Sequence, residues 1–173
     1  MATRSDCPLL VQFFQWNKLL LLYAGATQLL FTTRSDVSVI DVADWRTAAS
    51  PSNVTLSRRR SIVTGLEYAV AVDYVWSDGS VYWSDLTRVR GRIYRYQAAG
   101  VNATPAAGVV VVVVGRLEAP DGLACDWVGR KLYWADSETD RIEVANLDGT
   151  WRRVLYWRDI HQPRAIALDP TRG

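Results

Sequence analysis

The residues of this chain that could do chemistry are mostly carboxylates. His161 is the only histidine, and the two cysteines, Cys7 and Cys125, are far apart. This set offers neither a histidine-rich metal site, nor a zinc spacing, nor a disulfide framework. The acidic residues do not follow the spacing of a calcium loop, and no glycine-rich phosphate loop precedes a helix. We therefore expect no catalytic residue, no metal and no cofactor, and a protein that is not an enzyme.

Two of the carboxylates end the same short motif, Tyr-Trp-x-Asp, which reads Tyr82–Asp85 in one copy and Tyr133–Asp136 in the other. Tyr and Trp each bury roughly 150–250 Å² of surface, so the repeated pair is mainly a packing device. The Asp is expected to accept hydrogen bonds from the backbone or from Arg at the turn that follows. The residues that we assign to this structural repeat are Tyr82, Trp83, Asp85, Tyr133, Trp134 and Asp136.

Each motif lies in a longer pattern of strand, glycine turn, aromatic strand, polar turn and third strand. In the second copy the pattern predicts strands over 123–126, 131–136, 141–147 and 152–157. The stretch Pro120–Asp126 returns 43 residues later as Pro163–Asp169, within the roughly 40–50 residues expected of a β-propeller blade. The pattern therefore predicts an all-β fold, an incomplete propeller with about two full blades plus flanking strands.

Two further stretches complete this prediction. A weaker copy runs from Leu29 to Asp41 and lacks the Trp and the Asp of the motif. Six consecutive valines, Val109–Val114, stand between two glycines. A short apolar run bounded in this way predicts a fully buried strand.

The composition agrees with a globular β protein. The chain has 173 residues, 49% of them hydrophobic, with eight Trp and eight Tyr against three Phe. A net charge of +2 gives no reason to expect nucleic acid as a partner. The one basic run, Arg58–Arg60, is better explained as a solvated turn than as a heparin or nucleic-acid patch. No stretch approaches the roughly 18–20 apolar residues of a membrane helix, so we expect no direct membrane insertion of this fragment.

Residues 1–28 are expected to lie outside the propeller, which we assign to residues 29–173. Leu19–Tyr23 followed by Ala24–Ala26 has the order of a secretory signal, but its apolar core is shorter than the usual 7 to 15 residues or so. A degenerate signal and an unrelated leader are equally compatible with it. Two glycosylation sequons, at Asn53 and Asn102, lie in predicted loops and favour an extracellular compartment.

Over about residues 29–173, most densely from residue 117, the chain resembles the Tyr-Trp-Thr-Asp (YWTD) propellers of the low-density lipoprotein receptor family. The resemblance rests on Ala119–Trp127, Leu132–Gly149 and Gln162–Pro170. It is similar in particular to the first propeller of the Arrow-type Wnt co-receptors, the receptor-related proteins 5 and 6. Val128–Lys131 and Val144–Asn146 are closer to the protein 5 branch. The resemblance implies a fragment of a six-bladed propeller, with both sequons at family glycosylation positions.

The same resemblance implies binding rather than catalysis. The top face of the family's first propeller takes up Wnt proteins and secreted antagonists of the sclerostin and Dickkopf type, which present an Asn-x-Ile peptide, and a Frizzled-type receptor joins the full-length complex. The residues at matching contact positions are Leu86, Thr87, Asp121, Glu138 and Arg164. Asp121 and Glu138 would face a ligand Lys or Arg, Arg164 would orient them or bind ligand carbonyls, and Leu86 would offer apolar area.

The implied location is the extracellular part of a single-pass plasma-membrane protein whose transmembrane segment is not in this chain. One loop departs from the family: Leu86–Gly91 is basic where the family carries acidic residues. A Lys-bearing ligand should be held less well there. A nidogen-like matrix propeller, or a lipoprotein-receptor propeller with a structural or docking role, uses the same repeat and is the alternative. A propeller hydrolase is the least favoured class.

Overall fold

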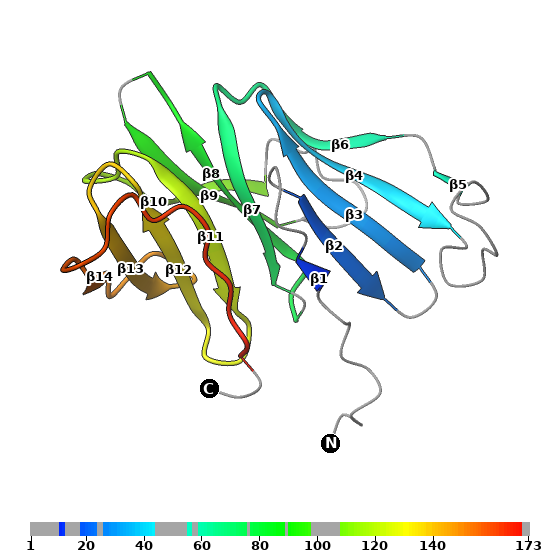
Figure 1. The fold of residues 1–173 in the computed structure, drawn as a ribbon. Coiled ribbons are helices and arrows are strands. Elements are labelled where there is room, and N and C mark those ends of the chain that lie inside the picture. Colours follow the sequence, from blue (N-terminus) through cyan, green and yellow to red (C-terminus); the bar gives the residue numbers. More distant parts are fainter. Residues whose placement is uncertain are drawn as a thin grey trace.

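The described residues form three β-sheets and contain no α-helix. The computed structural model describes the backbone of residues 11–12, 18–23, 26–43, 55–56, 59–75, 77–88, 90–97 and 108–170. Side chains are described for residues 28–40, 59–75, 77–88, 90–97 and 108–170. The sheets stand side by side, as the blades of an incomplete β-propeller do (Figure 1).

The first sheet has six strands. Its central hairpin is β3 and β4, joined by a tight turn, and β4 also pairs with β5 and β6. The strands are β1 (Val11–Gln12), β2 (Lys18–Tyr23), β3 (Ala26–Thr33), β4 (Asp36–Ala43), β5 (Thr55–Leu56) and β6 (Arg60–Thr64).

The second and third sheets are two complete four-stranded blades, each antiparallel and each built in chain order. The second sheet contains β7 (Ala69–Val75), β8 (Ser80–Leu86), β9 (Gly91–Tyr96) and β10 (Val109–Val113). The third contains β11 (Pro120–Asp126), β12 (Lys131–Asp136), β13 (Arg141–Asn146) and β14 (Arg153–Tyr156). The two full blades and the order of their strands agree with the sequence prediction.

The aromatic motif strands join neighbouring sheets through their two faces. Tyr82 belongs to the same buried cluster as Leu132 and Trp134 of the third sheet, whereas Trp83, the next residue, belongs to a second cluster that contains Leu30 of the first sheet. Alternation along a strand sends successive side chains to opposite faces, and in a propeller both faces are covered. The Tyr82 hydroxyl also donates to the carbonyl of Leu147 at 3.0 Å, and burial raises the pKa of Tyr82 to about 12.

The valine run is not the fully buried strand that we predicted. It forms β10, the outermost strand of the second sheet, and β9 is its one partner among the described strands. Val110 is 49% exposed and Val111 is 42% exposed. An apolar run does not reveal whether its strand lies inside a sheet or at its edge, and edge strands keep part of their surface in water.

Strand pairing begins before the predicted boundary at residue 29. β1 and β2 lie within residues 1–28, and β3 crosses the boundary. β2 pairs with β3 from Lys18↔Phe31 to Tyr23↔Ala26. The assignment of this segment as a leader stays a prediction.

The last described residues return to the innermost strand of the third sheet. The segment of residues 163–170 runs along β11 without forming a strand of its own (Figure 1). At Gly122 the approach is so close that a Cβ would lie 2.3 Å from the carbonyl oxygen of Arg164. Glycine at this position is what allows the two backbones to meet.

Candidate functional site: one rim of the blades

The loops that follow the second strands and the segments that precede the innermost strands meet at one rim of the molecule. The β12–β13 turn is joined to the segment before β11 by Ser137 N–H donating to Ala119 C=O at 3.0 Å. In the neighbouring blade Leu86 N–H donates to Tyr68 C=O at 2.9 Å. The residues with sequence-predicted ligand contacts all belong to this rim.

Asp136 organises the rim in the third sheet. This fully buried carboxylate accepts backbone N–H groups from two segments: Glu118 and Ala119 at 2.9 and 3.1 Å, and Glu138 and Thr139 at 3.3 and 3.2 Å. A buried ionised carboxylate needs such donors to replace water. It therefore fixes the turn that carries Glu138 against the segment that leads to Asp121.

Asp85 does the same in the second sheet with fewer donors. It accepts the N–H groups of Tyr68 at 2.6 Å and Glu67 at 3.4 Å, and it is 3% exposed. The backbone hydrogen bonds predicted for both motif carboxylates are therefore present. Burial of this kind leaves neither carboxylate accessible to a ligand.

Asp121 is the centre of the candidate binding site. One of its oxygens, Oδ2, accepts the Ser137 hydroxyl at 2.6 Å and Nη1 of Arg164 at 2.9 Å. Within the part of the chain that the structure describes, Oδ1 has no hydrogen-bond partner. The side chain of Asp121 is 14% exposed and that of Arg164 is 68% exposed. The pair thus offers one free carboxylate oxygen and several free guanidinium N–H groups to a ligand.

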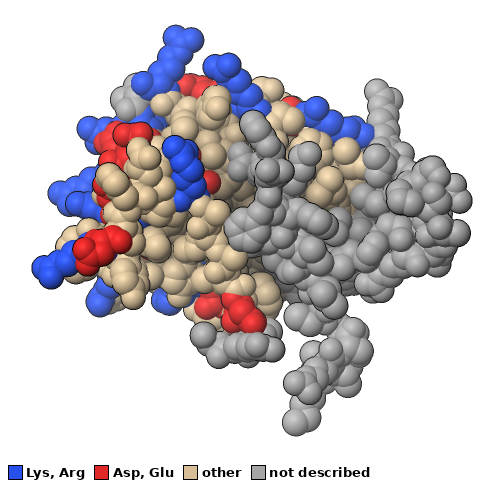
Figure 2. Space-filling view, in the orientation of Figure 1, with Lys and Arg blue, Asp and Glu red and all other residues tan. Residues whose placement is uncertain are grey.

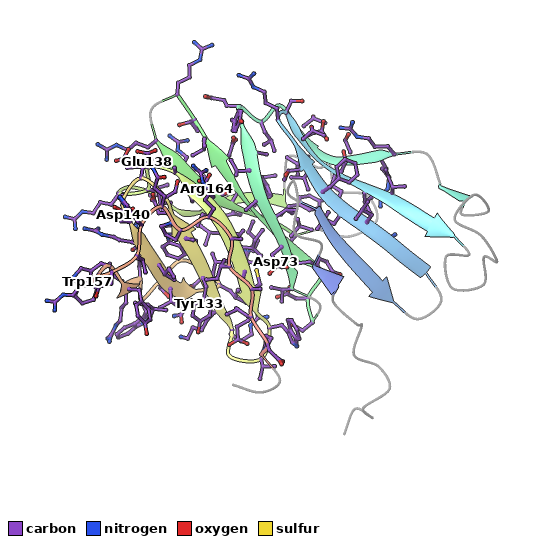
Figure 3. All side chains as sticks on the ribbon, viewed as in Figure 1. Asp73, Tyr133, Glu138, Asp140, Trp157 and Arg164 are labelled. Atoms are coloured by element: carbon purple, nitrogen blue, oxygen red, sulfur yellow. The ribbon has the colours of Figure 1, made fainter. Side chains whose placement is uncertain are left out.

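Glu138 is exposed beside this pair, and its carboxylate has no partner among the residues whose side chains are described. Figure 3 places Glu138, Arg164 and Asp140 together at one rim, with Tyr133 and Trp157 away from it. Asp140 binds the C-terminal segment, accepting Gln162 N–H at 2.7 Å and contacting His161 Nδ1 at 3.2 Å. The Gln162 N–H and the His161 ring lower the pKa of Asp140.

Leu86 and Thr87 lie on the rim of the neighbouring blade. Among the described side chains, no hydrogen bond or ion pair joins either of them to Asp121, Glu138 or Arg164. Both are half-buried. The Thr87 hydroxyl donates to Arg90 C=O at 2.7 Å and accepts Arg90 N–H at 3.2 Å. Because both hydrogen bonds of this hydroxyl lie within the turn, we assign Thr87 to the structure of the loop and not to ligand binding.

Three residues of the rim were missed by the sequence reasoning: Ser137, Asp140 and His161. Ser137 follows the motif Asp directly and is 4% exposed, so its position after the repeat could have indicated it. The link between Asp140 and the segment around His161 spans 21 residues. No local sequence pattern predicts a contact between residues so far apart in the sequence.

Buried groups near the centre of the blades are chemically distinctive but inaccessible. Asp73 Oδ2 accepts Cys125 N–H across the two innermost strands at 2.6 Å, and Asp73 is 4% exposed. Burial raises the pKa of Asp73 to about 7 and raises the pKa of the free Cys125 thiol well above its usual value. Both groups are enclosed between blades, which assigns them to packing.

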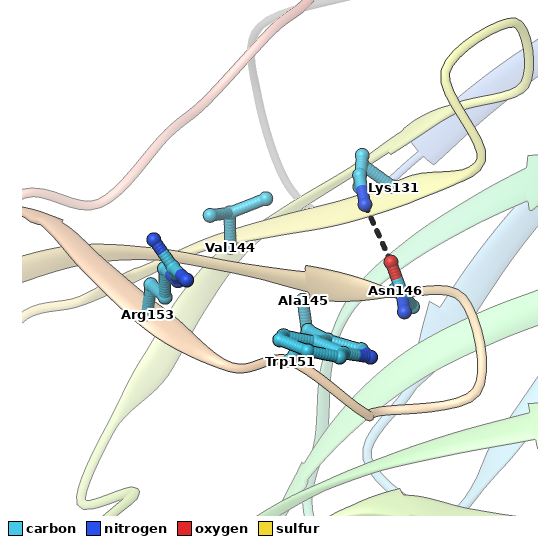
Figure 4. Close-up of a pocket in the computed structure, with 6 residues that line it drawn as sticks. All are labelled: Lys131, Val144, Ala145, Asn146, Trp151 and Arg153. Carbon is cyan, nitrogen blue, oxygen red and sulfur yellow. Dashed lines mark hydrogen bonds between the residues drawn. The ribbon is translucent and has the colours of Figure 1, made fainter.

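A pocket of about 440 Å³ lies on the third sheet, lined by residues of β12, β13 and the chain that follows them (Figure 4). Its lining carries no carboxylate; Lys131 Nζ donates to Asn146 Oδ1 at 2.5 Å, and Trp151 is 75% exposed. The lining residues are Lys131, Val144, Ala145, Asn146, Trp151 and Arg153. None of them belongs to the rim.

Both predicted glycosylation sites, Asn53 and Asn102, lie outside the described residues. No group of three metal-binding side chains occurs in the described part of the chain. Nor does any described segment form a helix long and apolar enough to cross a membrane.

Comparison with known proteins finds similarity to one receptor family. Residues 130–170 match the model of the low-density lipoprotein receptor repeat class B. Over 150 residues the chain is 47% identical to low-density lipoprotein receptor-related protein 5 of Mus musculus and 48% identical to that of Homo sapiens. Each match covers 87% of this chain and 8% of the relative. These matches confirm the resemblance on which the sequence prediction rests.

The fold has a counterpart among solved structures. A chain in the crystal structure of a nidogen/laminin complex superposes with a TM-score of 0.68 at 28% identity. The superposition covers 84% of this chain and 50% of that one.

Proposed function

Because the chain is a homologue of low-density lipoprotein receptor-related protein 5 and carries a class B repeat, we propose that it is a ligand-binding piece of the extracellular propeller of a Wnt co-receptor. It spans 8% of the length of these relatives. The ligands we propose are Wnt proteins and secreted antagonists with an Asn-x-Ile peptide, with a Frizzled-type receptor in the complete assembly. The whole protein would cross the plasma membrane once, outside this chain.

The observation that supports binding at the rim is the group of Asp121, Glu138 and Arg164. Their partly unused oxygens and N–H groups lie at one exposed edge. Hydrogen bonds to Asp136 fix the segment before Asp121 and the backbone of Glu138, and Arg164 is held by its contact with Asp121. A carboxylate and a guanidinium side by side suit a ligand side-chain amide and the peptide groups next to it, because donors and acceptors are both required. Preorganisation lowers the entropy lost when a ligand binds.

The test is a titration of a synthetic peptide with an Asn-Ala-Ile core against the full chain and two variants, Glu138→Ala and Arg164→Ala. We expect each variant to bind roughly three- to tenfold more weakly, since each removes one charged contact at a partly exposed interface. Arg153→Ala, an exposed arginine on β14, is the matched control and should bind normally. If both rim variants bind as tightly as the unchanged chain, the site is misassigned.

A structural role is the second candidate, supported by the similarity to the nidogen/laminin chain. A docking propeller of this kind would bind immobilised laminin with an affinity that Glu138→Ala and Arg164→Ala leave unchanged. It would also not bind the Asn-Ala-Ile peptide. The same protein samples thus distinguish the two functions.

We also propose that Asn53 and Asn102 carry glycans and that residues 1–28 contain a leader. Expression in a secreting cell line, followed by mass measurement with and without enzymatic deglycosylation, tests both. Thr55→Ala and Thr104→Ala should each remove one glycan, because both abolish a sequon. An unmodified protein of full mass in the medium would contradict both proposals.

A further inference from the structure

The turn between β8 and β9 projects unpaired positive charge beside the proposed site. Besides the Thr87 hydroxyl contacts, Thr87 N–H donates to Arg90 C=O at 3.3 Å, and Arg88 N–H donates to Glu67 Oε2 at 2.9 Å. The backbone of the turn is therefore fixed. The side chains of Arg88 and Arg90 are exposed, and within the described residues neither has an ion-pair or hydrogen-bond partner.

Arg116, in the segment before β11, adds a third charge in an unusual backbone conformation. Its φ is +53°, a left-handed value that non-glycine residues adopt rarely. Arg152 holds this conformation by donating to the carbonyls of Gly115 at 2.6 Å and Arg116 at 2.9 Å, while Glu143 anchors the Arg152 guanidinium through two 2.8 Å hydrogen bonds. The exposed Arg116 side chain is thereby presented from a fixed backbone.

The turn and the Arg116 segment touch. Gly91 N–H donates to Leu117 C=O at 3.0 Å, and a Cβ on Gly91 would lie 2.5 Å from Cδ of Pro120. Pro120 directly precedes Asp121. We call the surface of Arg88, Arg90 and Arg116 the basic rim; it adjoins the Asp121 site. Lys and Arg side chains gather along the corresponding upper edge in Figure 2.

Acidic residues flank the basic rim and limit what it can bind. Glu67 and Glu118 are exposed there. Glu67 acts electrostatically on the exposed Arg92, whose pKa is raised mainly by Tyr94 and also by this glutamate. A densely charged polyanion would be repelled by these carboxylates and by Asp121 and Glu138. A peptide with a few spaced carboxylates would not be.

Building on the proposed function, we propose that the basic rim binds Asp or Glu side chains of the same protein ligand. The neutral Asn-x-Ile part of that ligand lies against Asp121, Glu138 and Arg164. The preferred ligand is therefore an Asn-x-Ile segment flanked by carboxylates. Complementary charges of this kind set partner choice more than raw affinity.

The test uses the full chain and synthetic peptides with the same Asn-Ala-Ile core, extended at either end by four Ser, four Asp or four Lys. One Asp-extended peptide should bind about three- to tenfold tighter than its Ser counterpart at low salt, the range for a few exposed ion pairs. Most of that gain should vanish in 0.5 M NaCl, because screening is strong there. The Lys-extended peptides should bind more weakly than the Ser ones.

The double variant Arg88→Gln/Arg90→Gln should lose the Asp preference and keep its affinity for the Ser-extended peptides. The matched control Arg60→Gln/Arg153→Gln removes two exposed arginines elsewhere and should keep the preference. Equal binding of the Asp-extended and Ser-extended peptides would overturn the inference. So would a heparin fragment that displaces a labelled Asp-extended peptide at a lower concentration than the unlabelled Asp-extended peptide does. A peptide with four Asp but Ser in place of the core separates the two proposals. If it binds while the Ser-extended core does not, the basic rim stands and the proposed function fails.

Discussion

Nη1 of Arg164 lies 2.9 Å from Oδ2 of Asp121, and the two residues occupy the same place in successive repeats, 43 positions apart. The ion pair joins the start of β11 to the segment that runs beside it. Both side chains remain at the rim, where a ligand can reach them. One contact thus serves the repeat architecture and the proposed site together.

This ion pair should contribute little to stability. Arg164 is largely exposed, and exposed pairs are worth about 0.2–1 kcal/mol. A double-mutant cycle of Asp121→Ala and Arg164→Ala, measured by urea denaturation, should give a coupling free energy of unfolding in that range. A coupling above about 2 kcal/mol would assign the pair to the fold instead of the ligand.

Gly122→Ala should loosen the segment of residues 163–166. Its Cβ would clash with backbone atoms of Arg164 and Ile166, which cannot move as a side chain can. We expect a loss of about 1–3 kcal/mol in the free energy of unfolding, the range for overpacking. Gly129→Ala is the control and should cost less, since the three atoms nearest to its Cβ belong to the Asp126 side chain, which can shift by weakening its hydrogen bonds to the N–H groups of the same turn. Equal losses in the two variants would contradict the close approach at Gly122.

Asp136→Asn should destabilise the third sheet and its rim. The carboxylate accepts four backbone N–H groups, whereas an Asn side chain directs its own NH₂ group toward some of these donors. We expect a loss of about 2–4 kcal/mol from unsatisfied buried groups. Asp148→Asn changes an exposed turn carboxylate and should cost less than about 1 kcal/mol. Thermal unfolding followed by circular dichroism measures both.

The raised pKa of Asp73 should make the chain less stable as pH rises. Folded Asp73 titrates at about 7 and unfolded Asp at 3.8, so between these values the folded state holds a proton that the unfolded state lacks. Stability from this group is present at low pH and is lost as pH rises toward 7. From pH 5 to pH 8 the loss should reach about 2–3 kcal/mol.

Asp73→Asn should flatten this dependence, because it removes the titrating group. Urea unfolding at pH 5 and pH 8 provides the comparison, with Asp148→Asn as a control that keeps the slope of the unchanged chain. A slope that persists in Asp73→Asn would assign the pH dependence to other groups.

Much of the fold could be predicted because residues within the repeat mark the ends of its strands. β12 has the predicted bounds, since its polar first residue, Lys131, and the motif Asp136 mark both ends. The prediction of a fully buried valine strand was wrong because hydrophobic residues indicate a tendency to be buried but not whether their strand lies inside a sheet or at its edge. The strands within residues 18–28 were missed because the composition of that stretch resembles a leader.

The site was less predictable than the fold. Positions for Asp121, Glu138 and Arg164 came from family resemblance, and the meeting of Asp121 with Arg164 and Ser137 required the register of the repeats in space. The burial of Asp73 against Cys125 depends on two innermost strands lying side by side. Contacts between blades leave no local pattern in a sequence.

Amide hydrogen exchange of the full chain, with and without a saturating Asn-Ala-Ile peptide, tests the central claim most directly. The account predicts slower exchange in residues 117–121, 137–140 and 161–164 and no change in β13 and β14. Protection confined to β13 and β14, or no protection at a concentration where the peptide is bound, would contradict a binding site at the rim.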